Sequence, residues 1–445
     1  MFKKVLPLSL IIAFRFLGLF IVLPVLSLYA FSLPGATPTL VGIVIGGFAL
    51  TQMIFQVPFG IMSDMLGRKG TIITGLLLFA IGSALCALSS DILTLLLGRF
   101  LQGAGAVAAV ISAMISDLVK EEERAKAMAI MGGFVALSFA IAMVVGPVIS
   151  GFAGVNSLFW ITTILALASI VILIKMVPDS PKVTHTYHNV GKLEFLKKTE
   201  ILKMNLSNFL QKGFMTFAFM IIPIVMTKTY NWEVSELWML YIPAMIAGIL
   251  AMGPAAILAQ KKGKYKEVMI LGIIFFALSY LAFGNSESQT FFIVAVVLFF
   301  IGFNMHEPIM QSLTTKYIKV HERGKVLGVF NSFGYFGTFL GGLIGGIYLV
   351  EIDGTFHQSI NDIATVLVVL CVLWLIIMIT LPNPHKQKNI YLALEELNTQ
   401  KLEQLDSFKG IEEWYINNCE NIAIIKYNQE HTTEEKIIEL LEKRK

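Results

Sequence analysis

The sequence predicts an all-α membrane protein with twelve transmembrane helices in two six-helix bundles, followed by a small α+β domain. Three observations support this prediction. Hydrophobic residues make up 56% of the 445-residue chain, charged residues make up 14%, and the mean hydropathy is +0.75, a composition too apolar for a soluble protein of this length. The apolar residues gather in stretches long enough to span a bilayer. From residue 388 onward the composition becomes that of a soluble domain.

Each predicted span contains about 20 mostly apolar residues, the length that a hydrocarbon core of ~30 Å requires. The first stretch follows a short basic start, Met1-Phe2-Lys3-Lys4, and is too long for the core of a signal peptide, so we expect it to be retained as a helix. The predicted spans are 5–31, 38–62, 70–89, 92–116, 127–153, 157–177, 205–227, 235–259, 268–284, 290–313, 325–350 and 361–381.

Basic residues collect in the loops on one side of these spans. They occur at 68–69, 120–126, 261–266 and 316–325, whereas the opposite loops contain few cations apart from Lys228. Loops rich in Lys and Arg stay in the cytoplasm, so both termini of this multi-pass protein are predicted to be cytoplasmic. The net charge of +4 is small and predicts no nucleic-acid partner.

A polar stretch divides the spans six and six. The predicted domains are an N-terminal bundle at 1–177, a cytoplasmic linker at 178–203, a C-terminal bundle at 204–382 and a cytoplasmic domain at 388–445. The basic end of the linker either lies on the inner membrane surface or is a plain connection. Similar Glu-Arg-x-Lys segments precede the fifth and eleventh spans, at 123–126 and 322–325. This repeat predicts duplicated bundles, with the substrate site between them near the middle of the membrane.

A short charged turn joins the second and third spans, with the sequence Gly60-Ile61-Met62-Ser63-Asp64-Met65-Leu66-Gly67-Arg68-Lys69. This G-x-x-x-D-x-x-G-R-K pattern resembles the signature loop of the major facilitator superfamily. The resemblance implies a conformational switch formed by Gly60, Asp64, Gly67, Arg68 and Lys69. A basic loop that only orients a helical hairpin is the alternative. We expect Asp64 to reach the N-terminus of the eleventh helix when the cytoplasmic side closes, because a helix N-terminus favours an anion.

Polar side chains inside the spans are the candidates for proton coupling and for the cavity, since burying an unpaired ionisable group in a bilayer is costly. Glu307 is the preferred proton carrier, because a partly dry cavity raises the pKa of a carboxyl group. A salt bridge that locks two helices is its alternative, while Lys212 is predicted to be an interfacial anchor. His306 is adjacent to Glu307 and cannot face the same way. The full candidate set is Arg15, Arg99, Gln102, Asn304, His306 and Glu307.

The two arginines have structural alternatives. Arg99 and Gln102 resemble the R-x-x-Q-G motif of the family's fourth helix, and Arg99 is either functional or a hydrogen-bond hub. Arg15 either acts in transport, or pairs with a backbone carbonyl or extends its side chain to the membrane surface, which its depth disfavours. The segment 146–151 resembles the antiporter motif G-P-x-x-G-G of the drug/proton antiporter branch, with a serine in place of one glycine. Gly146, Pro147 and Gly151 are therefore expected at a close contact between helices.

The resemblance covers essentially the whole chain and implies a function. It implies a secondary transporter of the bacterial inner (cytoplasmic) membrane that exports small drug-like or amphipathic molecules by alternating access, driven by the proton gradient and without another cofactor. A proton symporter or facilitator for a polar solute, and a membrane sensor that works through its C-terminal domain, are the alternatives. The sequence shows no nucleophile–base pair and no phosphate-binding loop, so we do not expect an enzyme.

The C-terminal segment is predicted to contain a strand at 390–394, a helix at 401–408, strands at 411–416 and 422–427, and a helix at 433–443. This order resembles a small ferredoxin-like, metal-chaperone-type domain without its last strand. The C-x-x-C pair is missing and Cys419 is alone, so no metal site is predicted. A domain of this size has a small core. We therefore expect it to dock on the cytoplasmic loops or to self-associate, and either to sense and bias the gate or to be a passive appendage.

Overall fold

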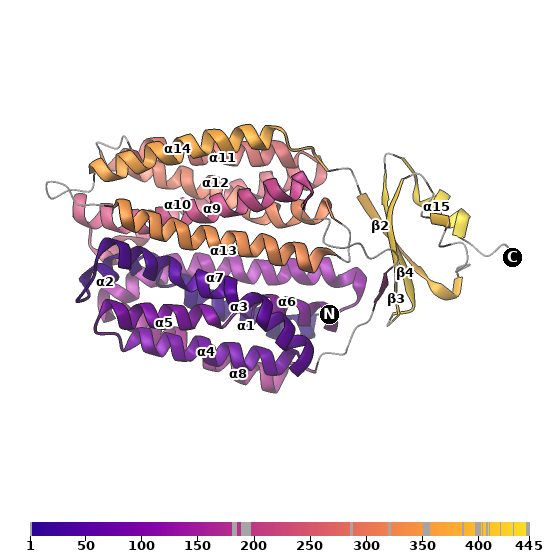
Figure 1. Ribbon diagram of the computed structural model, residues 1–445, viewed down its shortest axis with the longest axis horizontal. Helices are drawn as coiled ribbons and strands as arrows, with labels where there is room; N and C mark the ends of the chain where they lie inside the picture. Colours follow the sequence, from indigo (N-terminus) through magenta and orange to yellow (C-terminus); the bar gives the residue numbers. More distant parts are fainter. Residues whose placement is uncertain are drawn as a thin grey trace.

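In the computed structural model of the protein, two helical bundles lie side by side and a small sheet lies beyond one end of them (Figure 1). We call the end that faces the sheet the domain end and the opposite end the far end. The structure describes residues 2–179, 185–187, 197–284, 288–318, 322–349, 357–384, 387–396, 402, 404–405, 408, 410–418, 420–429 and 431–441.

The first bundle contains helices α1 to α8, and two of its six spans are interrupted. A turn at 21–25 contains Pro24, which cannot donate a backbone hydrogen bond, and it separates the first two helices. A second break at 105–107 divides the fourth span. The helices are α1 (Phe2–Phe20), α2 (Leu26–Ser32), α3 (Pro38–Leu66), α4 (Arg68–Ala87), α5 (Ile92–Ala104), α6 (Ala108–Leu118), α7 (Arg124–Ala153) and α8 (Val155–Met176).

The second bundle has six long helices, α9 (Thr199–Ile224), α10 (Trp238–Ala256), α11 (Tyr265–Gly284), α12 (Gln289–Lys316), α13 (Arg323–Tyr348) and α14 (His357–Ile379). Single π-helical turns, Val225–Thr229 and Ile257–Lys261, extend α9 and α10. Within the described residues, 11 helices are long and apolar enough to cross a bilayer. Together α1 and α2 form the remaining predicted span, so the membrane fold agrees with the sequence prediction.

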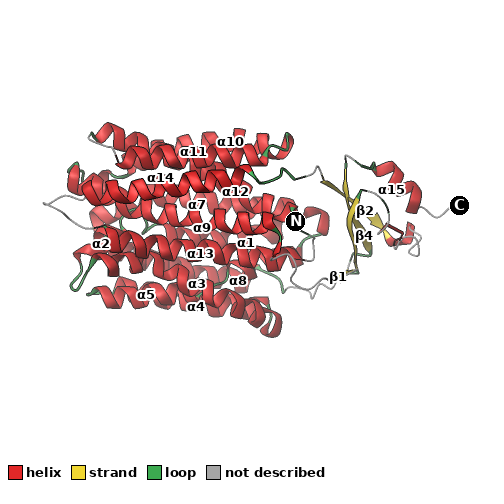
Figure 2. Ribbon diagram, turned by 45° about the horizontal axis from the view of Figure 1, so that its top comes forward, coloured by secondary structure: helices red, strands yellow, loops and turns green. Residues whose placement is uncertain are grey.

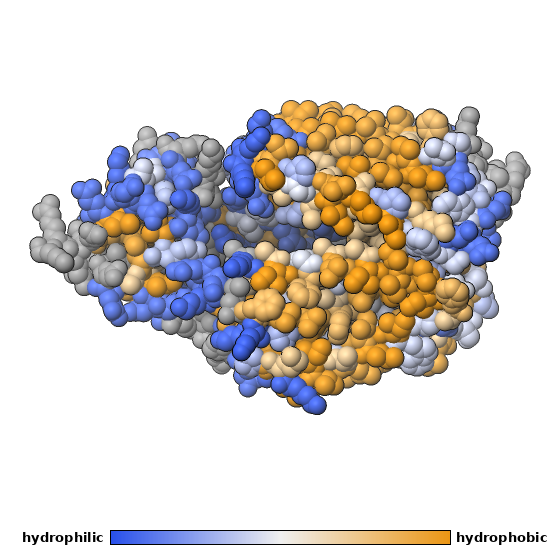
Figure 3. Space-filling view, turned by 180° about the vertical axis from the view of Figure 1, so that it is seen from behind, coloured by the Kyte–Doolittle hydropathy of each residue, from blue (hydrophilic) through white to orange (hydrophobic). Residues whose placement is uncertain are grey.

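Among the described residues, the close glycine contacts between the bundles lie toward the far end. Gly42 and Gly46 of α3 lie against the backbone of α13, where an added methyl group on Gly42 would overlap the carbonyl of Gly342. At the domain end, by contrast, Gly324 and Gly328 of α13 have no neighbouring atom within 4 Å of such a methyl group. Figure 3 shows a hydrophilic hollow between the two apolar lobes, and it opens toward the small domain. The structure is therefore closed at the far end and open at the domain end.

The small domain is built on an antiparallel sheet with the order β1-β3-β4-β2. Three strands are local, β2 (Gln387–Ala393), β3 (Ile411–Asn417) and β4 (Ile422–Asn428), and α15 (Glu434–Leu441) follows them. The fourth strand, β1 (His185–Tyr187), comes from the linker between the bundles and pairs with β3. Thus the last strand of a ferredoxin-like domain is absent from the described tail, and the linker adds a strand at the opposite edge.

The sheet has one face toward α15 and one toward the bundles (Figure 2). Side chains alternate along a strand, so Trp414 and Ile425 pack under α15 with Ile437, while Tyr415 and Lys426 face the bundles. Three parts of the sequence prediction lie wholly or partly outside the described residues: the helix at 401–408, Cys419, and the linker segment at 192–196. The linker prediction also ended at residue 203, whereas α9 already begins at Thr199.

Candidate functional site

Arg15 lies fully buried near the middle of the first span. Its Nη2 donates to Gln52 Oε1 at 3.2 Å and to the carbonyl oxygen of Gly105 at 3.1 Å. That carbonyl is available because the fourth span is broken there, so its regular helical hydrogen bonds are interrupted. The predicted alternative of carbonyl pairing is therefore observed. It satisfies only part of the guanidinium, since Nε and Nη1 have no acceptor among the described residues.

Gln52 connects Arg15 to the other bundle. The Gln52 amide Nε2 donates to the hydroxyl of Tyr335 on α13 at 2.7 Å. No other hydrogen bond between side chains of the two bundles occurs within the spans, as far as the structure describes them. Along the helices, the Gln52–Tyr335 bond lies between the close glycine contacts of α3 and α13 and the open domain ends of these two helices. We call the boundary between the two bundles the seam. Arg15, Gln52 and Tyr335 thus form a polar connection across the seam, at the inner limit of the hollow.

Arg99 and Gln102 lie within the first bundle. Arg99 donates from Nε to the carbonyl of Val44 at 3.2 Å and from Nη1 to Gln102 Oε1 at 2.8 Å, and Gln102 donates to Ser83 Oγ at 2.9 Å. The guanidinium also lies 4.6 Å from the centre of the Phe48 ring, within cation–π range. These contacts connect α3, α4 and α5, so the geometry is that of the hydrogen-bond hub.

Glu307 is held by a lysine from a neighbouring helix. Lys212 Nζ of α9 lies 2.9 Å from Oε1 and 2.8 Å from Oε2 of Glu307 on α12, and Gln211 donates to the same carboxylate at 3.3 Å. The side chain of Glu307 is 45% exposed. The salt bridge that was the alternative for Glu307 is therefore present. Lys212 is its partner rather than only an interfacial anchor.

His306 and Asn304 are packed inside the second bundle. His306 Nε2 lies 2.8 Å from the carbonyl oxygen of Met269, and the ring packs edge-on against Trp374. Asn304 donates to the carbonyl of Phe300 in its own helix at 2.9 Å. As the spacing on the helix required, His306 and Glu307 face different ways. Of the six predicted residues, Arg15 and Glu307 lie at the seam or the hollow, and the other four lie within a bundle.

The signature loop forms a charge network at the domain end. Gly67, at φ +85°, ends α3 and precedes α4, a backbone conformation that favours glycine. Arg68 lies 3.0 Å from Asp64 and 3.0 Å from Asp117 of α6. Lys69 pairs with Asp179 at 3.1 Å. Because the domain end is open, Asp64 is exposed and paired within its own loop, and its contact with α13 stays a prediction for the closed state.

The antiporter-like segment lies where α7 meets two neighbours near the far end. A methyl group on Gly146 would overlap the backbone carbonyl of Ile21 in the first span. On Gly151 it would lie 2.7 Å from Cβ of Ser235, which precedes α10 in the other bundle. Pro147 lies between them inside α7. Gly146 and Gly151 thus occur at close contacts, one within the first bundle and one between bundles, and Pro147 is buried in the helix between them.

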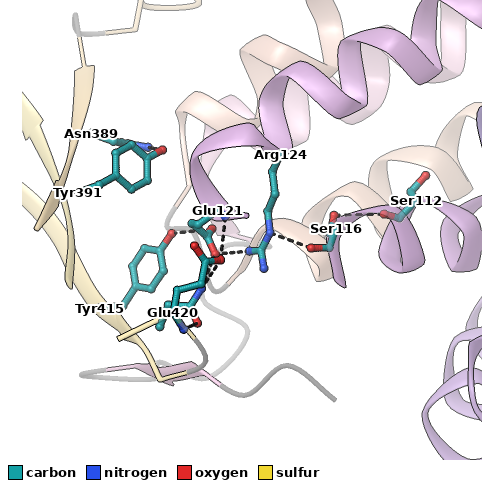
Figure 4. A network of polar contacts seen from close by, with 9 residues as sticks. Ser112, Ser116, Glu121, Arg124, Asn389, Tyr391, Tyr415 and Glu420 are labelled. Carbon is teal, nitrogen blue, oxygen red and sulfur yellow. Dashed lines mark hydrogen bonds and ion pairs between the residues drawn. The ribbon is translucent and has the colours of Figure 1, made fainter. Parts of the chain in front are cut away.

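The C-terminal domain contacts the first bundle at Glu121, in the turn between α6 and α7 (Figure 4). Tyr415 donates to Glu121 Oε1 at 3.1 Å, and Asn417 donates to Oε2 at 3.2 Å. The backbone N–H of Glu121 donates to Glu420 at 2.9 Å. Arg124 forms an ion pair with Glu121 and fixes its carboxylate from the bundle side.

The same domain contacts the second bundle through Lys426, which is 5% exposed. Its Nζ donates to the carbonyl of Ile318, between α12 and α13, at 3.3 Å. Burial, reinforced by the positive charge of Arg323, lowers the pKa of Lys426 to about 8. The carboxylate of Glu412 lies 3.8 Å away. One small domain therefore touches both bundles at the open end.

Sequence reasoning missed several residues of the seam. Gln52 and Tyr335 are neutral and occur in no motif, although an amide in the middle of a span was a usable signal. The glycines at positions 42 and 46, and those at 342 and 346, each have the small-x-x-x-small spacing of helix contacts, which was also a readable signal. The break at Gly105 contains no proline and had no clear signal.

The chain was compared with known proteins. A family model described as Major Facilitator Superfamily matches residues 8–210 and 204–409. The inner membrane transport protein YajR of Escherichia coli (strain K12) is 33% identical over 436 residues, which cover 95% of this chain and 93% of that protein. The quinolone resistance protein NorA of Staphylococcus aureus (strain Mu50) is 27% identical over 383 residues, covering 80% of this chain and 92% of that protein.

Solved structures agree on the fold. The crystal structure of a D-xylose-proton symporter superposes with a TM-score of 0.70 at 15% identity, covering 86% of this chain and 98% of that one. A nucleoside transporter, NupG, superposes with a TM-score of 0.67 at 17% identity, covering 85% and 99%. At these identities the likeness concerns the fold alone. From the family match and the E. coli relative, the chain belongs to the major facilitator superfamily and is a multi-pass membrane transporter.

Proposed function

We propose that this protein is a proton-coupled secondary transporter of the drug/proton antiporter branch, which exports small amphipathic molecules across the bacterial inner membrane. The observation that carries the proposal is Glu307, a carboxylate deep in the spans, half-exposed and held by Lys212. Protonation of Glu307 would remove the negative charge that joins α12 to α9. α9 packs along α13, and α13 packs along α3 of the other bundle. Loss of the Glu307 charge could therefore change the contact between the two bundles.

The basic residues support a cytoplasmic position for the domain end. Arg68, Lys69, Arg124 and Arg323 all lie at that end of the spans, and the loops that remain in the cytoplasm are rich in such residues. In this orientation the structure is the inward-open state. Alternating access then requires the domain end to close and the far-end contact between α3 and α13 to open. The relation to NorA favours export, and the residues of the cavity do not encode a direction.

Two alternatives differ in what they predict. A proton symporter for a polar solute would use the same Glu307 but would concentrate solute on the cytoplasmic side. A sensor would need the C-terminal domain for its output, and the contacts of that domain with both bundles favour this candidate over a passive appendage. We therefore also propose that the domain docks on the cytoplasmic loops and biases the gate.

The transport proposal is tested on the full-length protein reconstituted in vesicles that contain a pH-sensitive dye. Norfloxacin, ethidium and 2-naphthoate are added in turn under an imposed pH gradient. We expect at least one compound to drive proton movement in the wild type. Glu307→Gln preserves shape and hydrogen bonding but cannot titrate, so this variant should bind the compound and lose the coupled proton movement.

A matched variant removes a carboxylate outside the site. Glu267 lies at the domain end of α11 and accepts from Asn383, and Glu267→Gln should retain the coupled proton movement. If Glu307→Gln still moves protons with an unchanged pH profile, the coupling residue lies elsewhere. Accumulation of the compound on the side that faces the C-terminal domain would instead support the symporter.

A further inference from the structure

The charged side chains deep within the described spans do not balance. They are Arg15, Arg99, Lys212 and Glu307, whereas the other charged residues of the described spans lie near helix ends. The single carboxylate is already paired with Lys212. Two buried guanidinium groups therefore have no described counter-anion. An uncompensated charge in a membrane protein interior is costly and marks a functional group more often than a structural one.

The two arginines differ in how many of their hydrogen-bond donors have an acceptor in the protein. Arg99 has two acceptors and a ring face within one bundle, and a single nitrogen, Nη2, lacks a partner among the described residues. In that same part of the chain, Arg15 leaves both Nε and Nη1 without an acceptor. It also lies directly behind Gln52, whose amide is the hydrogen-bonded link to Tyr335 of the other bundle. Arg15 is thus the cation that separation of the bundles would uncover.

Aromatic rings lead from Arg15 across the seam to the second cation. The guanidinium lies 5.7 Å from the ring centre of Phe16, which stacks on Phe20 at 5.4 Å. Phe20 meets Phe139 of α7 at 5.0 Å, and Phe139 meets Phe303 of α12 at 6.1 Å. Lys212 lies 5.2 Å from the centre of that last ring. The seam therefore presents a continuous aromatic wall with a cation at each end.

We propose that the transported molecule is an aromatic organic anion, and that Arg15 binds its carboxylate or sulfonate group while the aromatic wall binds its body. The inference rests on the transport function proposed above and adds the class of substrate. When α3 and α13 separate at the level of Tyr335, an anionic oxygen takes the place of the Gln52 oxygen on the guanidinium. A charge-assisted hydrogen bond of this kind is about twice as strong as a neutral one, so a neutral molecule of the same shape binds less well.

The test uses 2-naphthoate and its neutral isostere 2-naphthamide with purified full-length protein. A ligand that binds the folded state raises the unfolding temperature in a saturable way. We expect 2-naphthoate to give half of its maximal shift at a concentration at least tenfold lower than 2-naphthamide. Acetate, which has the charge without the ring, should give no saturable shift at these concentrations. Equal titrations for the acid and the amide in the wild type would overturn the proposal without any variant.

Variants then locate the anion. Arg15→Gln should remove the difference between acid and amide, and Arg15→Lys should restore part of it because the positive charge returns. Lys228→Gln removes an exposed cation at the far end and should keep the full difference. A difference that persists in Arg15→Gln would overturn the assignment to this residue. If 2-naphthoate shows no advantage over 2-naphthamide in the thermal shift, while another compound still drives proton movement that needs Glu307, only the anion inference fails. If it binds through Arg15 but no compound moves protons, the transport proposal fails instead.

Discussion

Asp64 is a residue whose role depends on a state other than the one observed. Its side chain is 74% exposed and pairs with Arg68, and an exposed pair of this kind contributes at most about 1 kcal/mol to stability. Asp64→Asn should therefore leave expression and the unfolding temperature unchanged. We expect a several-fold slower initial rate of transport in vesicles, because asparagine lacks the charge that the N-terminus of α13 attracts when the domain end closes.

The control for this variant is Asp179→Asn. Asp179 is even more exposed than Asp64 and forms a similar ion pair, with Lys69, in the same charge network. It lies after α8 and outside the signature loop, so its loss should leave the transport rate near that of the wild type. A well-expressed Asp64→Asn protein that transports at the normal rate would remove the support for a latch at this position.

Residues were predictable where a charge interrupts an apolar run. Glu307 and Arg15 stand out in the sequence because ionisable groups are rare in membrane spans. Their partners did not follow from the sequence, since Lys212 and Glu307 meet only when the rotation of two helices is known. Gln52 and Tyr335 are 283 residues apart and neutral. A hydropathy pattern gives little sign of such a pair.

At the scale of elements, the spans were predictable and their interruptions were not. A chain in the bilayer must satisfy its backbone internally, so each long apolar stretch forms a helix. The break at Gly105 has no proline to announce it, although it provides the carbonyl that binds Arg15. Strand β1 was missed because only three residues of a polar linker pair with β3. The sheet edge that β1 joins is formed by β3, and it exists only once the C-terminal sheet has folded.

The contact between α3 and α13 is the element that holds the far end closed. We predict that Gly42→Ala shifts the protein toward the state that is open at the far end, because the new methyl group overlaps the carbonyl of Gly342. Overpacking of this kind costs typically about 1–3 kcal/mol, which corresponds to a shift of roughly 5- to 150-fold between the two states. Distances between spin labels at the far ends of α3 and α13 measure the shift.

Gly328→Ala is the matched change on α13. A methyl group there meets no atom within 4 Å, so the distance distribution should remain that of the wild type. The same distribution for Gly42→Ala and the wild type would show that the helices adjust locally, and the glycine contact would then not control the far end.

In the whole molecule, the C-terminal domain connects the first bundle, the second bundle and the linker at the open end. It touches the first bundle at Glu121 and the second bundle at Ile318, and its sheet includes a strand from the linker between them. Closing the domain end changes the separation of the two bundles there. A rigid sheet cannot keep both contacts during that change, so we expect a docked domain to stabilise the open state and to be released on closure.

Lys426 makes this docking depend on pH. Burial lowers its pKa from 10.5 to about 8 in the docked domain, so the docked state binds fewer protons than the released state between these two values. Docking is therefore weakest below pH 8, strengthens as the pH rises through this window and levels off near the ordinary pKa. From about pH 7.5 to 9.5 we expect the docking equilibrium to rise roughly 20-fold. The charged groups that share this interface include Arg323, Lys316, Glu412 and Glu413, and burial also lowers the pKa of Lys316.

The measurement is the fraction of docked domain in the full-length protein, read from spin labels on α15 and at Lys262 on the domain end of the second bundle. Lys426→Met removes the group with the large pKa shift and should remove most of the pH dependence, leaving any share of Lys316. Lys436→Met, on the exposed face of α15, should keep it. If the docked fraction does not change with pH in the wild type, or changes equally in Lys426→Met, then the contact with Ile318 does not control docking. The domain would in that case be held by the Glu121 contacts and by β1, both of which lie on the side of the first bundle and the linker.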